Sequence, residues 1–254
     1  MPLVAAPAVV LKLVPYSDTS RIVRLLTRDH GVVSALARGV RRARSRSAVG
    51  MDLFALGIVG VRLKSQTDLH TLTSFDLTRA HHGLAADVGR FSAASALAEL
   101  ALKCVPAAAH AEAFDAVETG LEALDRAAPA EAEAAALAAC WRLVTALGFE
   151  PVLDRCAVCG AAVGDTLAFS ALHGGGLCAT HRGEAGRTNR LAPEDRDALR
   201  ALLDGRWPEP PLDARHAAAH RRLLAAFIRH HLAEDRPLPA LDFWDKAAWT
   251  VTSS

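Results

Sequence analysis

The sequence predicts an α+β protein with more than one domain, in which a small β-barrel precedes an all-α domain that carries an inserted loop. Three observations predict this architecture. Residues 8–78 read as short strands, apolar residues recur at helical spacing from about residue 79, and a cluster of cysteines at 156–181 interrupts the helical pattern. The domains we expect are 1–80, 81–254 and, inserted into the second, 151–190.

Five β-rich runs follow one another in the first eighty residues, with no helical stretch between them. Turn signals such as Pro15 and the Asp-His-Gly sequence at 29–31 separate them. Five short strands in a segment of this length favour a small barrel. Gly57 and Gly60, both inside the fourth run, predict bulges or bends. The runs are residues 8–16, 20–27, 32–40, 51–64 and 68–78.

The second part of the chain shows helical periodicity. The composition agrees, because 51% of the residues are hydrophobic, only 5% are aromatic, and alanine makes up most of the apolar excess. The tail 236–244 is expected to be extended, since it contains Pro237 and Pro239. His216 and His220 lie four apart in the last helix and are assigned to a solvated face. The predicted helices are 82–105, 111–127, 131–148, 192–205 and 213–235.

The cysteine cluster has the spacing of a metal site, Cys156-x2-Cys159-x18-Cys178-x2-His181. Two chelating pairs on two tight turns place four soft or borderline ligands around one point, as tetrahedral Zn²⁺ requires. Four protein ligands leave no open position for substrate, so we expect one structural zinc ion. The alternative is a loop that has the shape of a zinc site but binds no metal, in which two buried cysteines are paired by accident.

Charge is distributed unevenly along the chain. The net charge of the whole sequence is +1, but residues 1–80 contain twelve Lys or Arg against five Asp or Glu. A basic module on an acidic body indicates contact with a polyanion. Its strongest cluster, "ARGVRRARSRS", gives a predicted phosphate-binding edge formed by Arg38, Arg41, Arg42, Arg44 and Arg46. The alternative is a solvated charged loop.

Other features of the sequence restrict the function classes. The chain has no run of about 20 apolar residues that would span a membrane, and its start lacks the basic region of a signal peptide. Five cysteines fit a reducing compartment better than a disulfide framework, so a cytoplasmic protein is expected. The chain has no Ser-His-Asp order, phosphate loop or dinucleotide glycine pattern, and we expect no enzymatic activity. The candidates for base stacking in the basic module are only Tyr16, Phe54 and Phe75, which favours backbone contact without sequence readout.

Several segments, in the same order over nearly the whole chain, resemble the RecO family of bacterial DNA repair proteins. They are "VLKLVPYSDTSRIVRLLTRDHGVVSALARGVRR", "LGFEPVLDRCAVCG", "FSALHGGGLC" and "RPLPALDFW". The resemblance implies an N-terminal OB-fold, a helical domain and a zinc-binding insertion. It also implies binding of single- and double-stranded DNA, annealing of complementary strands, and loading of the RecA recombinase together with RecR and the single-stranded DNA-binding protein SSB.

Carried onto this sequence, the family's basic OB-fold surface falls on Arg38, Arg41 and Arg42, with Arg44 and Arg46 extending it. The family's metal ligands fall on Cys156, Cys159 and Cys178, and His181 stands where a cysteine is common. The acidic, Phe-ending tail of SSB would bind a surface that includes the helix carrying Arg142. The resemblance implies a cytoplasmic, nucleoid-associated protein. Two other classes stay open on the residues alone, a zinc-dependent enzyme and a zinc-ribbon transcription regulator.

Overall fold

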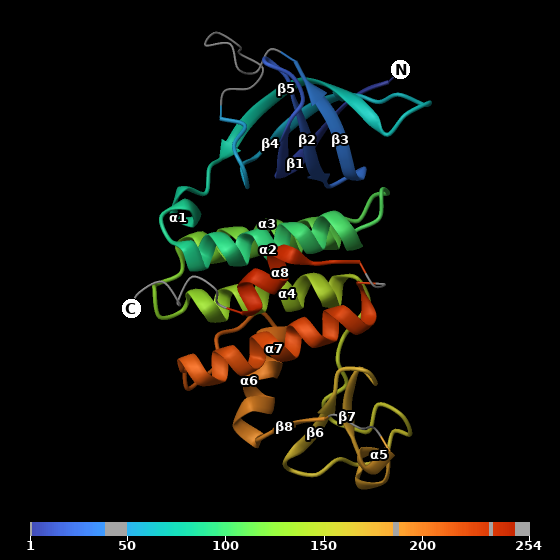
Figure 1. The fold of residues 1–254 in the computed structure, drawn as a ribbon, viewed down its shortest axis with the longest axis vertical. Helices are drawn as coiled ribbons and strands as arrows, with labels where there is room; N and C mark the ends of the chain where they lie inside the picture. The colour runs from blue at the N-terminus through green and yellow to red at the C-terminus, as the bar shows by residue number, and fades with distance from the viewer. Residues whose placement is uncertain (1, 39–49, 185–187, 234–235, 247–254) are drawn as a thin grey trace. The chain divides into compact units, whose positions relative to one another are not determined.

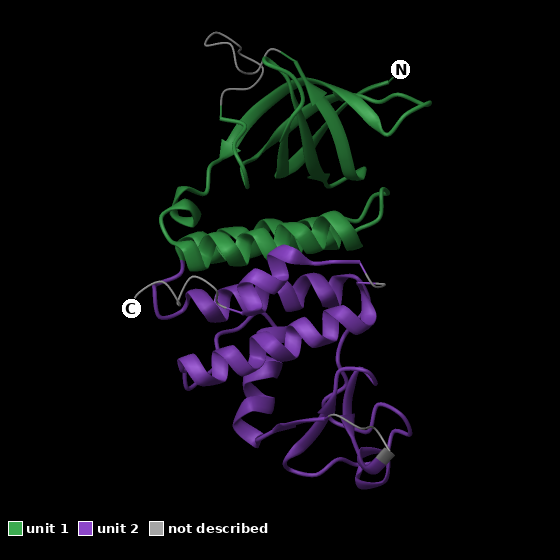
Figure 2. Ribbon diagram, in the orientation of Figure 1, with its two compact units in different colours: residues 1–126 green, residues 127–254 purple. Residues whose placement is uncertain are grey.

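A computed structural model describes residues 2–38, 50–184, 188–233 and 236–246 of the protein (Figure 1). The chain forms two compact units, residues 1–126 and 127–254 (Figure 2). Unit 1 holds all five strands of a closed barrel and three helices, and unit 2 holds the remaining helices and a small separate sheet. Within the described ranges, no helix is both long and apolar enough to cross a membrane.

The barrel closes in the strand order β1-β2-β3-β5-β4, and β4 pairs back onto β1. All neighbours are antiparallel except β3 and β5, whose parallel pairing joins Ser34 to Leu69. β3 alternates buried and partly exposed residues along its whole length, as a strand with one face on the barrel core must. This topology confirms the predicted five-stranded OB-fold. The strands are β1 (Leu3–Pro15), β2 (Arg21–Thr27), β3 (Gly31–Ala37), β4 (Leu56–Arg62) and β5 (Leu69–Arg79).

The predicted irregularities lie in the fourth strand. The register between β4 and β5 shifts at Leu56/Gly57 and again at Gly60/Val61, which confirms the bulges expected from the two glycines. The barrel interior is filled by Val, Leu and Ala from all five strands, together with Phe75. Phe54 is also buried, whereas Tyr16 is exposed.

The helices of unit 1 are α1 (His82–Ala85), α2 (Val88–Cys104) and α3 (Ala111–Arg126). The prediction of a single helix over 82–105 is wrong, because α1 and α2 are separate helices and Asp87 lies between them. This residue has an extended backbone, and its carboxylate accepts a hydrogen bond of 2.8 Å from the Arg90 N–H as the N-cap of α2. Ion pairs join α3 to the barrel, from Arg28 to Asp115 and from Arg79 to Glu122.

Four helices build the core of unit 2, namely α4 (Ala132–Ala146), α6 (Pro193–Leu203), α7 (Ala214–His231) and α8 (Pro239–Asp245). The extended tail predicted over 236–244 is wrong from Pro239 onward, where α8 begins. A proline is compatible with the first helical turn because the N–H it lacks has no partner there. The fully buried Trp244 and an ion pair of 2.7 Å between Arg229 and Asp242 then hold α8 against α7.

The insertion contains a three-stranded sheet in the order β7-β6-β8, built from β6 (Leu167–Ser170), β7 (Gly175–Leu177) and β8 (Asn189–Leu191). A short helix, α5 (Ala179–Glu184), follows β7. Every residue of β6 is buried, and the Phe169 ring lies 6.4 Å from the Phe227 ring of α7. The insertion is therefore packed onto the helical core.

The two histidines of α7 have different surroundings. His216 is exposed and hydrogen-bonds the Asp213 carboxylate at the start of the helix. His220 is 2% exposed, and its Nε2 lies 3.7 Å from Asp195 of α6. The expectation of a solvated face is therefore wrong for His220, which packs on the side of α7 that faces α6.

Candidate metal centre and nucleic-acid interface

The structure brings together the four ligands that the cysteine spacing predicts. The ligand atoms of Cys156, Cys159, Cys178 and His181 all lie within 4.8 Å of one another, and the group can hold a metal ion. The two sulfur atoms of Cys159 and Cys178 are 3.9 Å apart. The His181 Nδ1 lies 3.5 Å from the Cys156 sulfur and 3.3 Å from the Cys178 sulfur.

Each pair of ligands is held by a local turn. The first pair is closed by a hydrogen bond of 2.9 Å from the Gly160 N–H to the Cys156 carbonyl. Gly160 has φ of +74°, in the left-handed region where a side chain is strained. The second pair spans the first turn of α5, where the Arg182 N–H donates to the Cys178 carbonyl at 2.9 Å.

Backbone donors favour the thiolate form of two of the three cysteines, Cys156 and Cys178. Burial raises the pKa of the Cys156 thiol, but hydrogen bonds from the backbone N–H groups of Cys178, Cys159 and Val158 outweigh it and lower this pKa to about 6. The backbone N–H of His181 lowers the pKa of Cys178. Thiolates are the form that binds metal, so these two cysteines favour a cation. The Ala161 backbone donor lowers the pKa of Cys159, but burial and the neighbouring Cys156 and Cys178 thiols outweigh it and raise this pKa.

The donor set decides what this centre can do chemically. Three sulfurs and one nitrogen complete a tetrahedron, so no position is left for a substrate or a metal-bound water. Such a centre holds two chain segments together, one before β6 and one after β7.

The structure places only one of the five predicted DNA-binding arginines. Arg38 is exposed and directly follows Ala37, the last residue of β3, which pairs with Arg21 of β2. The other four, Arg41, Arg42, Arg44 and Arg46, lie outside the described residues.

The barrel carries further cations that the sequence reasoning missed. Lys12 of β1 lies directly opposite Arg24 of β2, and Arg24 lies opposite Ser34 of β3. Residues paired in this way point to the same face of the sheet. The register of the strands creates this pairing, and the alternation of polar with apolar residues in the first two runs is the only signal of it in the sequence.

We define the barrel cations as Lys12, Arg21, Arg24 and Arg38. Within the part of the chain that the structure describes, none of the four makes an ion pair. Two like charges directly opposite each other destabilise a sheet. An anion bound between Lys12 and Arg24 would therefore reduce the repulsion between their two positive charges.

Arg24 also lines a cavity of about 570 Å³ within unit 1. Lys64 and His70, from the β4–β5 connection and the start of β5, line the same cavity, and so do Asp29 and Asp68. The His70 Nδ1 accepts a hydrogen bond of 3.2 Å from the Lys64 backbone N–H. The β2–β3 face and the β4–β5 loop are the parts of an OB-fold that bind oligonucleotides.

The expected partner-binding helix carrying Arg142 is α4. Arg142 is exposed, and its side chain lies against Gly205, where an added Cβ would approach its Cδ to 3.1 Å. Gly205 lines a cleft of about 670 Å³ together with Arg200, Arg206 and Trp207. Trp207 is 40% exposed, which is unusual for so large an apolar side chain.

Comparisons with known proteins cover almost the entire chain. The family models described as "Recombination protein O N terminal" and "Recombination protein O C terminal" match residues 1–81 and 85–240. The chain is 38% identical over 243 residues to the DNA repair protein RecO of Anaeromyxobacter dehalogenans (strain 2CP-C), covering 94% of both chains. It is 31% identical over 240 residues to the DNA repair protein RecO of Myxococcus xanthus (strain DK1622), covering 93% of this chain and 94% of that one. These matches, the closed barrel and the Cys/His cluster show that the chain belongs to the RecO family of DNA repair proteins, with a role in recombination repair.

Proposed function

We propose that the protein is a non-enzymatic recombination mediator of the cytoplasm and nucleoid. It binds single- and double-stranded DNA without strong sequence preference and anneals complementary strands. With RecR and SSB, it promotes the loading of RecA. Annealing needs no covalent step, because the obstacle is the mutual repulsion of two phosphate backbones. A surface of positive charge that reads no bases lowers this obstacle for any sequence.

The observation that carries the proposal is the pair of barrel cations Lys12 and Arg24, which lie opposite each other and make no ion pair among the described residues, in a chain of the RecO family. Each guanidinium can fork onto phosphate oxygens. In the sequence, Arg38 is followed within eight residues by Arg41, Arg42, Arg44 and Arg46, which add to the positive charge of this part of the chain. The only exposed candidate for base stacking among Tyr16, Phe54 and Phe75 is Tyr16, which supports backbone contact as the main mode.

The test replaces Arg38, Arg41 and Arg42 together by alanine and measures DNA affinity as a function of salt. Each lost phosphate contact should reduce the slope of log K against log salt by about 0.7 for a single strand, and annealing should slow. A control removes the same charge from three other exposed arginines, Arg126, Arg182 and Arg215. Unchanged affinity and slope in the first variant would show that this surface does not bind DNA.

A zinc-ribbon transcription regulator is separated from this proposal by competition. A DNA of scrambled sequence should displace the bound DNA as well as the original sequence does, because phosphate contacts carry no sequence information. A strong preference for one sequence would instead favour the regulator.

The cleft beside Arg142 supports binding of the acidic, Phe-ending tail of SSB. Trp207 offers an aromatic contact for a phenylalanine ring, and Arg142 makes no ion pair with another described residue. Arg200 and Arg206 add charge, although ion pairs with Asp154, Asp197 and Asp204 engage them. Replacing Arg142 or Trp207 by alanine should weaken binding of a peptide with that tail and leave DNA affinity unchanged. If both variants bound the peptide as tightly as the wild type does, the tail would bind at another surface.

We also propose that the metal is one structural Zn²⁺. In a tetrahedron with Zn–S of about 2.3 Å and Zn–N of about 2.0–2.1 Å, two sulfurs lie about 3.8 Å apart and a sulfur and a nitrogen about 3.6 Å apart. The distances of 3.9, 3.5 and 3.3 Å agree with these values. Metal analysis of protein purified without chelator should give about one zinc per chain, since the site has one complete ligand set. A metal-free protein of equal stability would support the alternative of a metal-free loop.

A further inference from the structure

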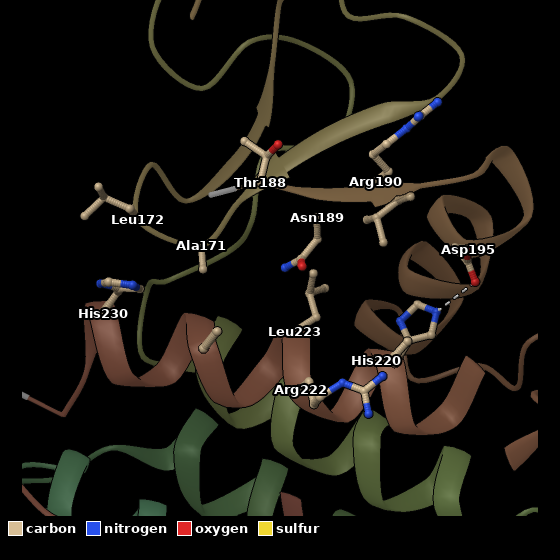
Figure 3. Close-up of a pocket in the computed structure, with 13 residues that line it drawn as sticks. Ala171, Leu172, Thr188, Asn189, Arg190, Asp195, His220, Arg222, Leu223 and His230 are labelled. Atoms are coloured by element: carbon tan, nitrogen blue, oxygen red, sulfur yellow. Dashed lines mark ion pairs between the residues drawn. The ribbon is translucent and has the colours of Figure 1, made fainter. Parts of the chain in front are cut away.

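Unit 2 contains a cavity of about 760 Å³ between β8 and α7, which we call the β8–α7 pocket (Figure 3). Its volume is in the range of pockets that hold small ligands. It is separate from the cleft beside Arg142, with which it shares no lining residue. Leu172, Leu191 and Leu223 supply apolar parts of its wall, and none of the described residues that line it is Phe, Tyr or Trp.

Polar groups of the wall lack partners. The side chains of Thr188, Asn189 and Arg222 line the pocket, and none of them makes a hydrogen bond or an ion pair with another residue of the described ranges. Figure 3 shows the Asn189 amide pointing from β8 toward α7, whereas Arg190 runs away from α7. Among the described residues that line the pocket, the two arginines Arg190 and Arg222 outnumber the one carboxylate, Asp195.

The wall of the pocket also contains a buried polar ring that lacks a hydrogen-bond partner. His220 belongs to the wall and is 98% inaccessible, and neither of its ring nitrogens has a hydrogen-bond partner. The distance of 3.7 Å from Nε2 to Asp195 exceeds that of a hydrogen bond (Figure 3). Buried polar atoms without partners are rare in proteins, and an ordered water or ion is one explanation for them.

We propose that the β8–α7 pocket binds a phosphate group, carried either by a nucleic-acid strand or by a free nucleotide. Phosphate oxygens can accept hydrogen bonds from the Asn189 amide, which points toward α7, and from the Arg222 guanidinium (Figure 3). A carboxylate offers only two oxygens to the same donors. The apolar wall accommodates the sugar or base attached to the phosphate.

The proposal places a nucleotide contact in unit 2, in addition to the barrel cations of unit 1. It does not depend on DNA binding by the barrel. The arginine at this site has a matched control on its own helix, because Arg215 is exposed on α7, two turns before Arg222, and does not line the pocket.

The experiment compares the full-length protein with Arg222→Ala, Asn189→Ala and Arg215→Ala. Binding of deoxythymidine monophosphate is followed by NMR, and binding of single-stranded oligothymidylate by fluorescence anisotropy over a range of salt concentrations. Arg222→Ala should reduce the salt slope for the oligonucleotide by about 0.7, one phosphate contact. Asn189→Ala should weaken binding with little change in slope, and Arg215→Ala should change neither.

The two sources of phosphate give different results. If Arg222→Ala weakens binding of both probes, the pocket accepts a free nucleotide, and if it weakens only oligonucleotide binding, the phosphate belongs to a strand. Arg222→Ala and Asn189→Ala proteins that bind both probes like the wild type would overturn the proposal, and so would an acidic peptide that alone binds in an Arg222-dependent manner. Loss of binding on substitution of Arg38, Arg41 and Arg42 reports on the barrel, so the two proposals can fail separately.

Discussion

The metal centre gives the sharpest prediction about a single side chain. Replacing His181 by cysteine exchanges a nitrogen ligand for a sulfur. The sulfur–nitrogen distances of 3.3 and 3.5 Å would have to lengthen to about 3.8 Å, the separation of two sulfurs in tetrahedral zinc. This is a change of 0.5 Å or less, which the first turn of α5 can absorb. His181→Cys should therefore keep about one zinc per chain.

Replacing Cys156 by serine should have the opposite result. Cys156 is 2% exposed and supplies the thiolate with the lowered pKa, so its loss leaves three ligands and a buried hydroxyl. Zinc content should fall to a small fraction, and the insertion should become sensitive to proteolysis. In isolated finger peptides the metal contributes about 10–16 kcal/mol of apparent folding free energy. The loss should be smaller in this chain, because Phe169 and Leu167 of the same insertion are fully buried.

The assay combines metal analysis with limited proteolysis and DNA binding on both variants and the wild type. We expect Cys156→Ser to lose metal and local stability before it loses DNA affinity. Loss of DNA binding in a variant that stays folded would refute a purely structural role. Zinc content in Cys156→Ser equal to that of the wild type would refute the four-ligand site.

Three further predictions concern the two units. Trp244→Ala should lower the free energy of unfolding by about 3–5 kcal/mol in urea titrations, because the ring is fully buried; a loss under 1 kcal/mol would mean that α8 is not docked. Gly31→Ala should destabilise the protein by more than about 1 kcal/mol, since φ is +61° and a Cβ would lie 2.3 Å from the Ala108 carbonyl oxygen; a neutral effect would contradict this turn. Burial lowers the pKa of His220, and Asp195 opposes this effect only in part. As pH falls below about 6.5, the unfolded chain therefore takes up a proton before the folded chain does, and the free energy of unfolding declines. In His220→Gln this decline should be weaker, and a pH profile of stability equal to that of the wild type would contradict a neutral buried ring.

Sequence patterns predict those parts of this protein that depend on local periodicity or spacing. The barrel strands and the two bulges follow from alternation and from Gly57 and Gly60. The ligand set follows from the spacing of Cys156 to His181, because chelating pairs on tight turns need little tertiary information. Both are properties of neighbouring residues, so the sequence carries them directly.

Other parts depend on partners that are distant in the sequence. Pro237 and Pro239 indicate an extended tail, but the burial of Leu241 and Trp244 against the core stabilises a helix there. Tertiary contacts override the local signal. Lys12 and Arg24 lie opposite each other because of the register between β1 and β2, and the alternation of residues along each strand does not determine that register.

His220 shows that part of the missing information was present. It lies three, four and seven residues before Leu223, Leu224 and Phe227, which places it on the apolar face of α7. Reading the helical period instead of the adjacent arginine and alanines would have predicted its burial. That neither ring nitrogen has a hydrogen-bond partner follows only from the packing of the folded chain.

The central claim is that the barrel cations bind the DNA backbone. The most direct test is the salt dependence of single-stranded DNA affinity for the triple variant Lys12→Ala, Arg24→Ala, Arg38→Ala beside the control variant lacking Arg126, Arg182 and Arg215. The claim predicts that the slope of log K against log salt falls by about 2, or about 0.7 for each of three phosphate contacts, while the control keeps the wild-type slope. A triple variant that stays folded and keeps the full slope would contradict it.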